Sequence, residues 1–203
     1  MLLTSILETI VNDHALHCKW LNTLSYMENA GAKKISASEH KEAVTLLILK
    51  HAAEEHRHAY YLKKQLAKLD ENACKTYSNA ELLAPNYTKF YLNILDVQVC
   101  RYLKKHFMLS GTALKFAAYL FVTYAIEVRA DELYPIYQDV LTSKQSRVTV
   151  KSIILEEEGH LEEMINQLKE FSSEWEAHAL EVIKLEQLLF DGWMRSLEAQ
   201  LAN

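Results

Sequence analysis

The sequence predicts an all-α protein with a single helical domain spanning residues 1–203. Four glycines and two prolines in 203 residues leave little material for turns. Leu, Ala, Glu and Lys, which favour helices, dominate the composition, and apolar residues recur at helical spacing. The length suits one domain with a sizeable core.

The helices can be placed in order along the chain. The first is predicted over about residues 2–30, ending near Gly31. Ser36 or Ser38 can cap a second helix that ends near Leu69, with acidic residues in its first turns where the helix dipole favours them. Four further helices follow a connection over residues 70–86 that has room for one helical turn, at about residues 88–108, 113–141 (with Pro135 as a candidate kink), 146–171 and 174–201.

The pattern Glu-x-x-His occurs twice, as Glu55 with His58 and as Glu157 with His160. Residues three apart lie on the same face of a helix, so each copy presents a carboxylate and an imidazole together. The two copies therefore predict two helices that each offer a pair of metal ligands.

A single glutamate precedes each copy in an apolar helical stretch, Glu28 by 27 residues before Glu55 and Glu127 by 30 residues before Glu157. Each half can fold as an antiparallel helix pair with its acidic groups at one depth, facing the bundle axis. Four buried carboxylates are very costly without a cation, and two divalent ions would balance them. The sequence thus predicts a dinuclear metal site, the alternative being solvated glutamates on long helices.

From Glu28 through His160 the chain resembles the ferritin-like di-iron carboxylate superfamily, which includes ferritins, rubrerythrins and several oxygenases. The resemblance implies a four-helix bundle of two helix pairs, with a crossover helix between them and an additional C-terminal helix. It implies that Glu28 serves one ion together with the first Glu-x-x-His, that Glu127 serves the other together with the second, and that one glutamate from each half bridges. The implied metal is iron, with manganese as the alternative, and mixed carboxylate and imidazole ligands suit both.

Acidic residues also precede each motif glutamate, at Glu54 and Glu156. The resemblance implies that Glu54 orients His160 and that Glu156 orients His58 by hydrogen bonds. The alternative is that both glutamates are exposed on their helices.

Three further residues are candidates for contact with the site. Asp131 lies one turn after Glu127, and Tyr124 is one of several tyrosines close in sequence to a ligand that could carry electrons. His51 lies one turn before Glu55 on the same stripe, which fits an extra ligand, an acid-base group of the pocket or a partly buried structural histidine.

The function expected from these residues is an oxidoreductase in which two iron ions activate O2 or peroxide, acting on a small or elongated organic substrate. Small residues near the ligands, Ala52, Ala59, Ala125 and Ala130, would leave room for it. Four alternatives remain: a ferroxidase or iron-storage protein, a rubrerythrin-like peroxidase, a tRNA-modifying hydroxylase and a non-enzymatic helical binding module.

Composition restricts the partners. The net charge of −5, with scattered lysine pairs, gives no sign of nucleic-acid binding. Cys18, Cys74 and Cys100 form no C-x-x-C pair, which favours reduced thiols in a cytoplasmic protein and argues against a rubredoxin-type centre. The N-terminal stretch lacks the features of a signal peptide, and no apolar run is long enough to span a membrane.

The last helix, which contains Trp193, would pack outside the bundle or form the contact of a homodimer.

Overall fold

The computed structural model describes residues 3–202, so residues 1, 2 and 203 of the predicted domain lie outside the described part. These residues form helices joined by loops, with no strand among them, and the prediction of an all-α fold is confirmed. The elements in chain order are α1 (Leu3–Asn12), α2 (His14–Ala37), α3 (Leu46–Leu69), a 3-10 turn (Asn79–Glu81), α4 (Pro85–Phe107), α5 (Gly111–Ser143), α6 (Lys151–Phe171) and α7 (Trp175–Leu201).

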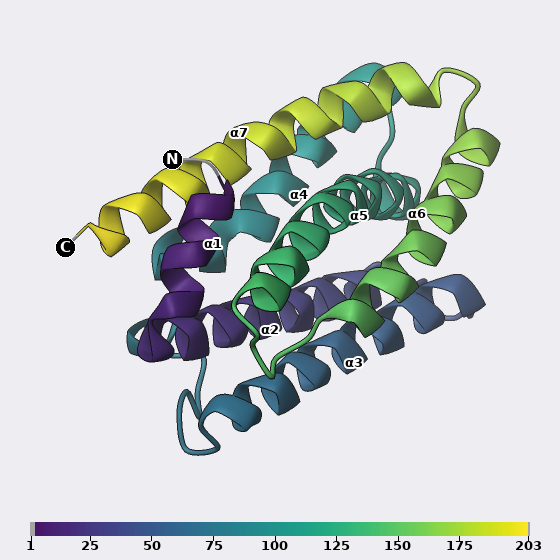
Figure 1. Ribbon diagram of the computed structural model, residues 1–203. Helices are drawn as coiled ribbons and strands as arrows, with labels where there is room; N and C mark the ends of the chain where they lie inside the picture. Colours follow the sequence, from purple (N-terminus) through teal and green to yellow (C-terminus); the bar gives the residue numbers. More distant parts are fainter. Residues whose placement is uncertain (1–2, 203) are drawn as a thin grey trace.

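The helices form two pairs and a cover. α2 packs along α3, and α5 packs along α6, which are the two most extensive helix contacts in the described residues. Figure 1 shows α4 passing behind α5 on its way between the pairs, and α7 running along the side of the molecule away from α3. α7 packs on α4 and α5, and the short α1 packs against α5 and α2. The α2–α3 pair and the α5–α6 pair therefore form the centre of the fold, and α1, α4 and α7 pack around them.

The prediction of one continuous first helix was wrong. The structure has two helices there, α1 and α2, which meet at Asp13. The backbone of Asp13 is extended, and its carboxylate accepts a hydrogen bond of 2.9 Å from the backbone N–H of Leu16. An aspartate in this position caps a new helix and ends the preceding one. α2 then continues through Gly31 to Ala37, past the predicted end, since one glycine inside a helix costs only about 1 kcal/mol.

The second helix begins later than predicted, at Leu46. Ser38 ends α2 instead of starting α3, and its hydroxyl donates to the backbone carbonyl of Lys34. In the loop, the Nδ1 atom of His40 accepts hydrogen bonds from the backbone N–H groups of Glu42 and Ala43. Such local side-chain to backbone bonds compete with helix formation, which accounts for the delay. The later helices begin and end within about five residues of their predicted bounds.

The apolar core consists of two clusters with a polar layer between them. Along α5, Ala125 belongs to one cluster and Leu133 to the other, and Glu127 lies between them. The same alternation holds along α3 and α6, where the Glu-x-x-His residues separate the two clusters. The apolar residues on either side of that layer are Ala52 and Leu62 on α3, and Ile153 and Met164 on α6.

The C-terminal helix is anchored by both apolar and charged contacts. Trp193 and Leu197 are buried on it, whereas Leu188 is 68% exposed on its other face. The guanidinium of Arg129 on α5 donates to both carboxylate oxygens of Glu186, at 2.9 and 2.8 Å. α7 therefore packs on the outside of the two pairs. No single helix in residues 3–202 is long and apolar enough to cross a membrane, and α4 and α5 meet that test only jointly, across a bend of 118°.

Candidate metal centre

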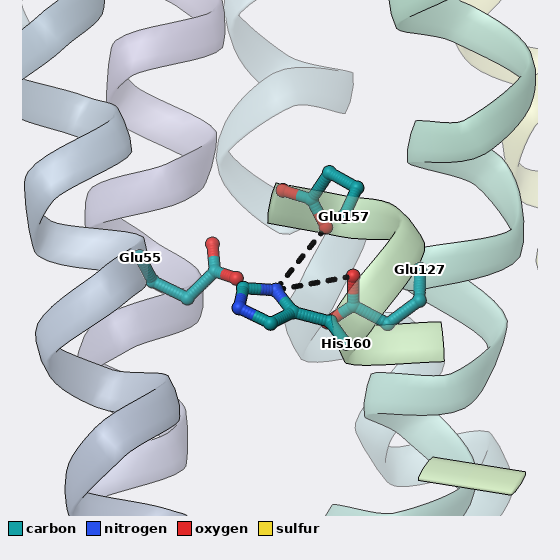
Figure 2. A group of neighbouring side chains, drawn as sticks. All are labelled: Glu55, Glu127, Glu157 and His160. Atoms are coloured by element: carbon teal, nitrogen blue, oxygen red, sulfur yellow. Dashed lines mark ion pairs between the residues drawn. The ribbon is translucent and has the colours of Figure 1, made fainter. Parts of the chain in front are cut away.

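The six side chains selected by their spacing converge in the polar layer. Glu55 on α3, Glu127 on α5, and Glu157 and His160 on α6 each offer one ligand atom, and these four atoms lie within 4.8 Å of one another. Figure 2 shows these side chains pointing toward a common point from three helices.

A second group of side chains lies next to the first, and its ligand atoms also lie within 4.8 Å of one another. It contains Glu28 from α2 together with Glu55 and His58 from α3. Glu55 belongs to both groups, so the two are adjacent and share one carboxylate. This is the arrangement expected of two neighbouring ions with a common ligand.

Burial distinguishes the cluster from ordinary surface glutamates. Glu55 is 7% exposed, and Glu127 and Glu157 are each 3% exposed. Glu28 is half-buried. Glutamates are almost never buried to this extent without a partner, so these three are not the solvated surface charges of the alternative interpretation.

The Nε2 atom of each histidine contacts a carboxylate outside the cluster. Nε2 of His58 lies 2.8 Å from Oε2 of Glu156, and Nε2 of His160 lies 2.9 Å from Oε2 of Glu54. A carboxylate that accepts from Nε2–H fixes the tautomer whose Nδ1 has a free lone pair. These are the two pairings that the resemblance to di-iron proteins implied, and each joins α3 to α6.

The inner faces of the histidines have no hydrogen-bond partner. Nδ1 of His58, Nδ1 of His160 and Oε2 of Glu157 are buried atoms without a hydrogen bond in the described residues. Nδ1 of His58 lies 3.0 Å from Oε1 of Glu157, and Nδ1 of His160 lies 3.4 Å from Oε2 of the same residue, yet neither contact forms a hydrogen bond. Buried polar atoms normally have a partner. Their common orientation toward the carboxylates therefore suits a cation between them.

The pKa shifts show what holds the cluster together in the metal-free protein. Burial, with the charge of Glu28 in addition, raises the pKa of Glu55 well above its ordinary value. Burial and the adjacent Glu157 do the same for Glu127. Burial alone would also raise the pKa of Glu157, but the neighbouring Glu127, His160 and His58 outweigh it and lower that pKa.

Burial acts in the opposite sense on the pKa values of the two histidines, but the neighbouring carboxylates outweigh it. Burial lowers the pKa of His58, but Glu157 and Glu28 outweigh burial and raise it to about 9. Glu157 and Glu54 likewise raise the pKa of His160 against burial. The surroundings of the cluster thus favour the protonated forms of both imidazoles and of Glu55 and Glu127. A cation would replace these protons, which is the usual competition at a metal site.

The residues fit a pair of divalent ions. The four glutamates carry four negative charges when ionised, and two neutral imidazoles add two nitrogen donors. Oxygen and nitrogen donors of this kind suit iron, manganese and zinc, and the cluster contains no thiolate. The donor chemistry, the charge balance and the unpartnered Nδ1 atoms agree.

His51 lies beside the cluster without joining it. Its Nε2 lies 2.9 Å from Oε2 of Glu163, and its Nδ1 lies 2.8 Å from the hydroxyl of Tyr119. Its ring centroid is 5.2 Å from that of His160. Both nitrogens are therefore occupied, and His51 has no lone pair directed at the carboxylates.

The structure does not bring Asp131 or Tyr124 to the cluster. Four residues advance an α-helix by about 40° beyond a full turn, and this rotation leaves Asp131 exposed although Glu127 is buried. Tyr124 is half-buried, and its ring packs edge-on against Trp175 of α7, with centroids 5.9 Å apart. Neither residue is in a position to act on the glutamates directly.

Three further residues near the site were not predicted from the sequence. Tyr134 is buried, and its hydroxyl donates to Oε1 of Glu28. It lies seven residues after Glu127, two turns further along the same face of α5, and that spacing could have identified it. Glu163, which contacts His51, follows His160 by three residues, so helical spacing could have identified it too. Nothing in the sequence indicates that Tyr119 contacts His51.

A cavity of about 420 Å³ adjoins the cluster between α2, α4, α5 and α7. Glu28, Glu55, Glu127 and Tyr134 are among its lining residues. Of the four alanines expected to leave room for a substrate, Ala130 lines the cavity and the other three do not. Its wall is mainly apolar, formed by Leu24, Met27, Ile35, Leu92, Val122, Ile126, Leu133, Phe190 and Trp193 among others.

Comparisons of this chain with models of protein families, with curated proteins and with solved structures found no match. Fold and site together define an all-α protein with a buried glutamate and histidine cluster that could hold metal ions.

Proposed function

We propose that this protein is a dinuclear-iron oxidoreductase with a ferritin-like bundle, which reacts with O2 or peroxide and acts on an organic substrate bound in the cavity. The observation that carries the proposal is the pair of buried Nδ1 atoms of His58 and His160, which form no hydrogen bond and face the carboxylates of the cluster.

The helix arrangement supports the ferritin-like assignment. Glu28 and the first Glu-x-x-His come from the α2 and α3 pair, and Glu127 and the second come from the α5 and α6 pair. α4 connects the pairs, and α7 is an addition on the outside. This is two up-down pairs joined by a long crossover.

Each ion would take ligands from one helix pair. Glu28, Glu55 and His58 would hold one ion, and Glu127, Glu157 and His160 would hold the other. Glu55 belongs to both groups, which favours it as a bridging ligand. Glu157 is the corresponding candidate from the other half, because its Oε1 lies 3.0 Å from Nδ1 of His58.

Side chains beside the cluster would orient the ligands. Glu54 and Glu156 would keep both imidazoles in the tautomer that binds metal. Tyr134 would hold Glu28 by its hydrogen bond to Oε1. Bound iron would supply the electrons for reduction of O2 or peroxide, chemistry that no side chain of the cluster provides.

The cavity favours an enzyme over an iron-storage protein. Its wall is mainly apolar and three carboxylates of the cluster, Glu28, Glu55 and Glu127, open onto it. Iron on its way to a mineral requires polar surfaces, whereas an organic molecule requires an apolar pocket with few polar groups.

The test is a single exposure of the ferrous protein to oxygen. Protein loaded anaerobically with about two Fe(II) per chain should consume O2 in proportion to that iron and keep the iron through gel filtration. The H160A variant should consume far less at the same iron concentration. Oxidation of many irons per chain, with growth of a mineral, would instead establish a ferroxidase.

A further inference from the structure

We propose that the cavity binds an elongated apolar molecule with an anionic end, and that Lys115 recognises that end at the cavity mouth. The inference deepens the proposed function, on which it rests only in treating the bound molecule as the substrate. Its evidence is the shape of the cavity, the position of its mouth and the charges there.

The cavity is elongated along two antiparallel helices. Along α2 and its C-cap residue the lining extends from Leu24 to Ser38, and on α5 from Lys115 to Tyr134. At 1.5 Å per residue these spans correspond to about 21 and 29 Å along the helix axes. A long narrow ligand fits such a space better than a compact one.

The mouth lies at the end formed by Ala37 and Lys115. Both line the cavity and both are exposed, while Lys34 and Ser38 beside them are half-buried. At the opposite end Leu24, Leu133, Tyr134 and Trp193 are each at most 6% exposed. A ligand therefore enters from the Lys115 end.

The charges at the mouth do not cancel. Nζ of Lys34 lies 3.2 Å from Oδ2 of Asp96 across the gap between α2 and α4, and these two charges compensate each other. Lys115 has no ion-pair partner among the described residues, so the charged residues that line the cavity at its mouth, Lys34, Asp96 and Lys115, carry one net positive charge. An anion is the complementary group.

The deep end of the cavity offers no competing anion site. Arg129 lines the wall there, but its guanidinium already donates to both carboxylate oxygens of Glu186 and to the side chains of Glu132 and Gln187. Its charge is therefore compensated within the protein. The remaining deep residues are aromatic or aliphatic. The apolar part of the ligand would therefore point inward, past the carboxylates.

The position of the metal cluster sets which part of the ligand can react. Glu127 lies twelve residues after Lys115 on α5, about 18 Å along the helix axis. Glu28 lies six residues before Lys34 on α2, about 9 Å away. A molecule whose charged end stays at the mouth would thus present an interior position of its apolar chain to the cluster, and not its charged end.

The experiment measures binding to the metal-free protein, so it does not depend on iron or on turnover. Isothermal titration calorimetry measures this binding directly, and it is preferred to tryptophan fluorescence because Trp193 lines the deep end of the cavity, beyond the reach of a ten-carbon chain held at Lys115. The probes are decanoate, decanol and decyltrimethylammonium, which share one chain and differ in charge. Decanoate should bind most tightly.

Substitutions at Lys115 test the recognition of the charged end. An exposed charge pair contributes about 0.2–1 kcal/mol, so K115Q should weaken decanoate binding about 1.5–5-fold and leave decanol unchanged. K115E should reverse the preference toward decyltrimethylammonium. The control is K144Q, which removes an exposed lysine at the other end of α5, away from the cavity lining, and should change nothing.

Equal affinity for decanoate and decanol, absence of binding, or equal effects of K115Q and K144Q would overturn the inference. Failure of the proposed function has a different result, namely a protein that binds decanoate through Lys115 but takes up no iron. Iron uptake without any preference for the anionic probe would overturn the present inference alone.

Discussion

Replacing Glu127 by glutamine should make the metal-free protein more stable at pH 7 while removing a metal ligand. Glu127 is 3% exposed and lies among other carboxylates. Burial and the adjacent Glu157 raise its pKa well above 4.5. The amide of E127Q has nearly the same shape, carries no charge, and can donate to Glu157 as the protonated carboxyl would.

The magnitude follows from proton linkage. A carboxyl whose folded pKa is raised binds a proton in the folded state that it has lost in the unfolded state, so stability falls as the pH rises above 4.5. Each pH unit between 4.5 and 7 lowers the free energy of unfolding by about 1.4 kcal/mol at most, so keeping this proton costs the folded protein up to about 3 kcal/mol at pH 7. E127Q carries no such proton. Its free energy of unfolding should therefore exceed that of the wild type by up to about 3 kcal/mol at pH 7, or roughly 6–12 °C in Tm for a chain of this size, and by nothing near pH 4.5.

The assay is thermal unfolding, followed by circular dichroism, of chelator-treated protein between pH 5 and pH 7. The control is E162Q, which changes an exposed glutamate of α6 and should show no such trend. With saturating Fe(II) or Mn(II) under anaerobic conditions the order should reverse, because the wild-type protein binds the ions more tightly. Lower stability of metal-free E127Q at pH 7, or a difference from wild type that does not grow with pH, would refute the reasoning.

Four other substitutions have distinct expected outcomes. E54Q and E156Q should each weaken metal affinity about 10–100-fold in equilibrium titrations without changing the number of ions bound, because they loosen a histidine and remove no ligand. Y134F should cost metal-free protein about 0.5–1.5 kcal/mol in urea unfolding, from one lost hydrogen bond, and should leave metal content intact. E186A should cost up to about 3–5 kcal/mol in the same assay, since it removes the buried carboxylate to which Arg129 donates twice and leaves the guanidinium only Glu132 and Gln187.

Helical periodicity predicted much of the cluster because ligand geometry on one helix is local. Glu55 and His58 share a face of α3 wherever that helix packs, and the same holds for Glu157 and His160 on α6. Spacing from Glu28 and Glu127 then limited how the helices could pair. The structure brings these six side chains together.

Other features depended on contacts that periodicity does not contain. The break at Asp13 depends on one capping hydrogen bond, and the late start of α3 depends on a turn held by His40. His51 shares the stripe of Glu55, but Tyr119 and Glu163, from other helices, occupy its nitrogens. The cavity likewise results from the packing of four helices and could not be deduced from the alanines of one stripe.

Metal content per chain tests the central claim most directly. Protein purified from iron-supplemented cells, or reconstituted anaerobically, should contain about two ions per chain by quantitative metal analysis. E127A and H160A should each contain clearly less, because each loses a donor of the group shown in Figure 2, while E162A should match the wild type. Negligible metal in the wild-type protein, or two ions retained in both E127A and H160A, would contradict the assignment of a dinuclear site.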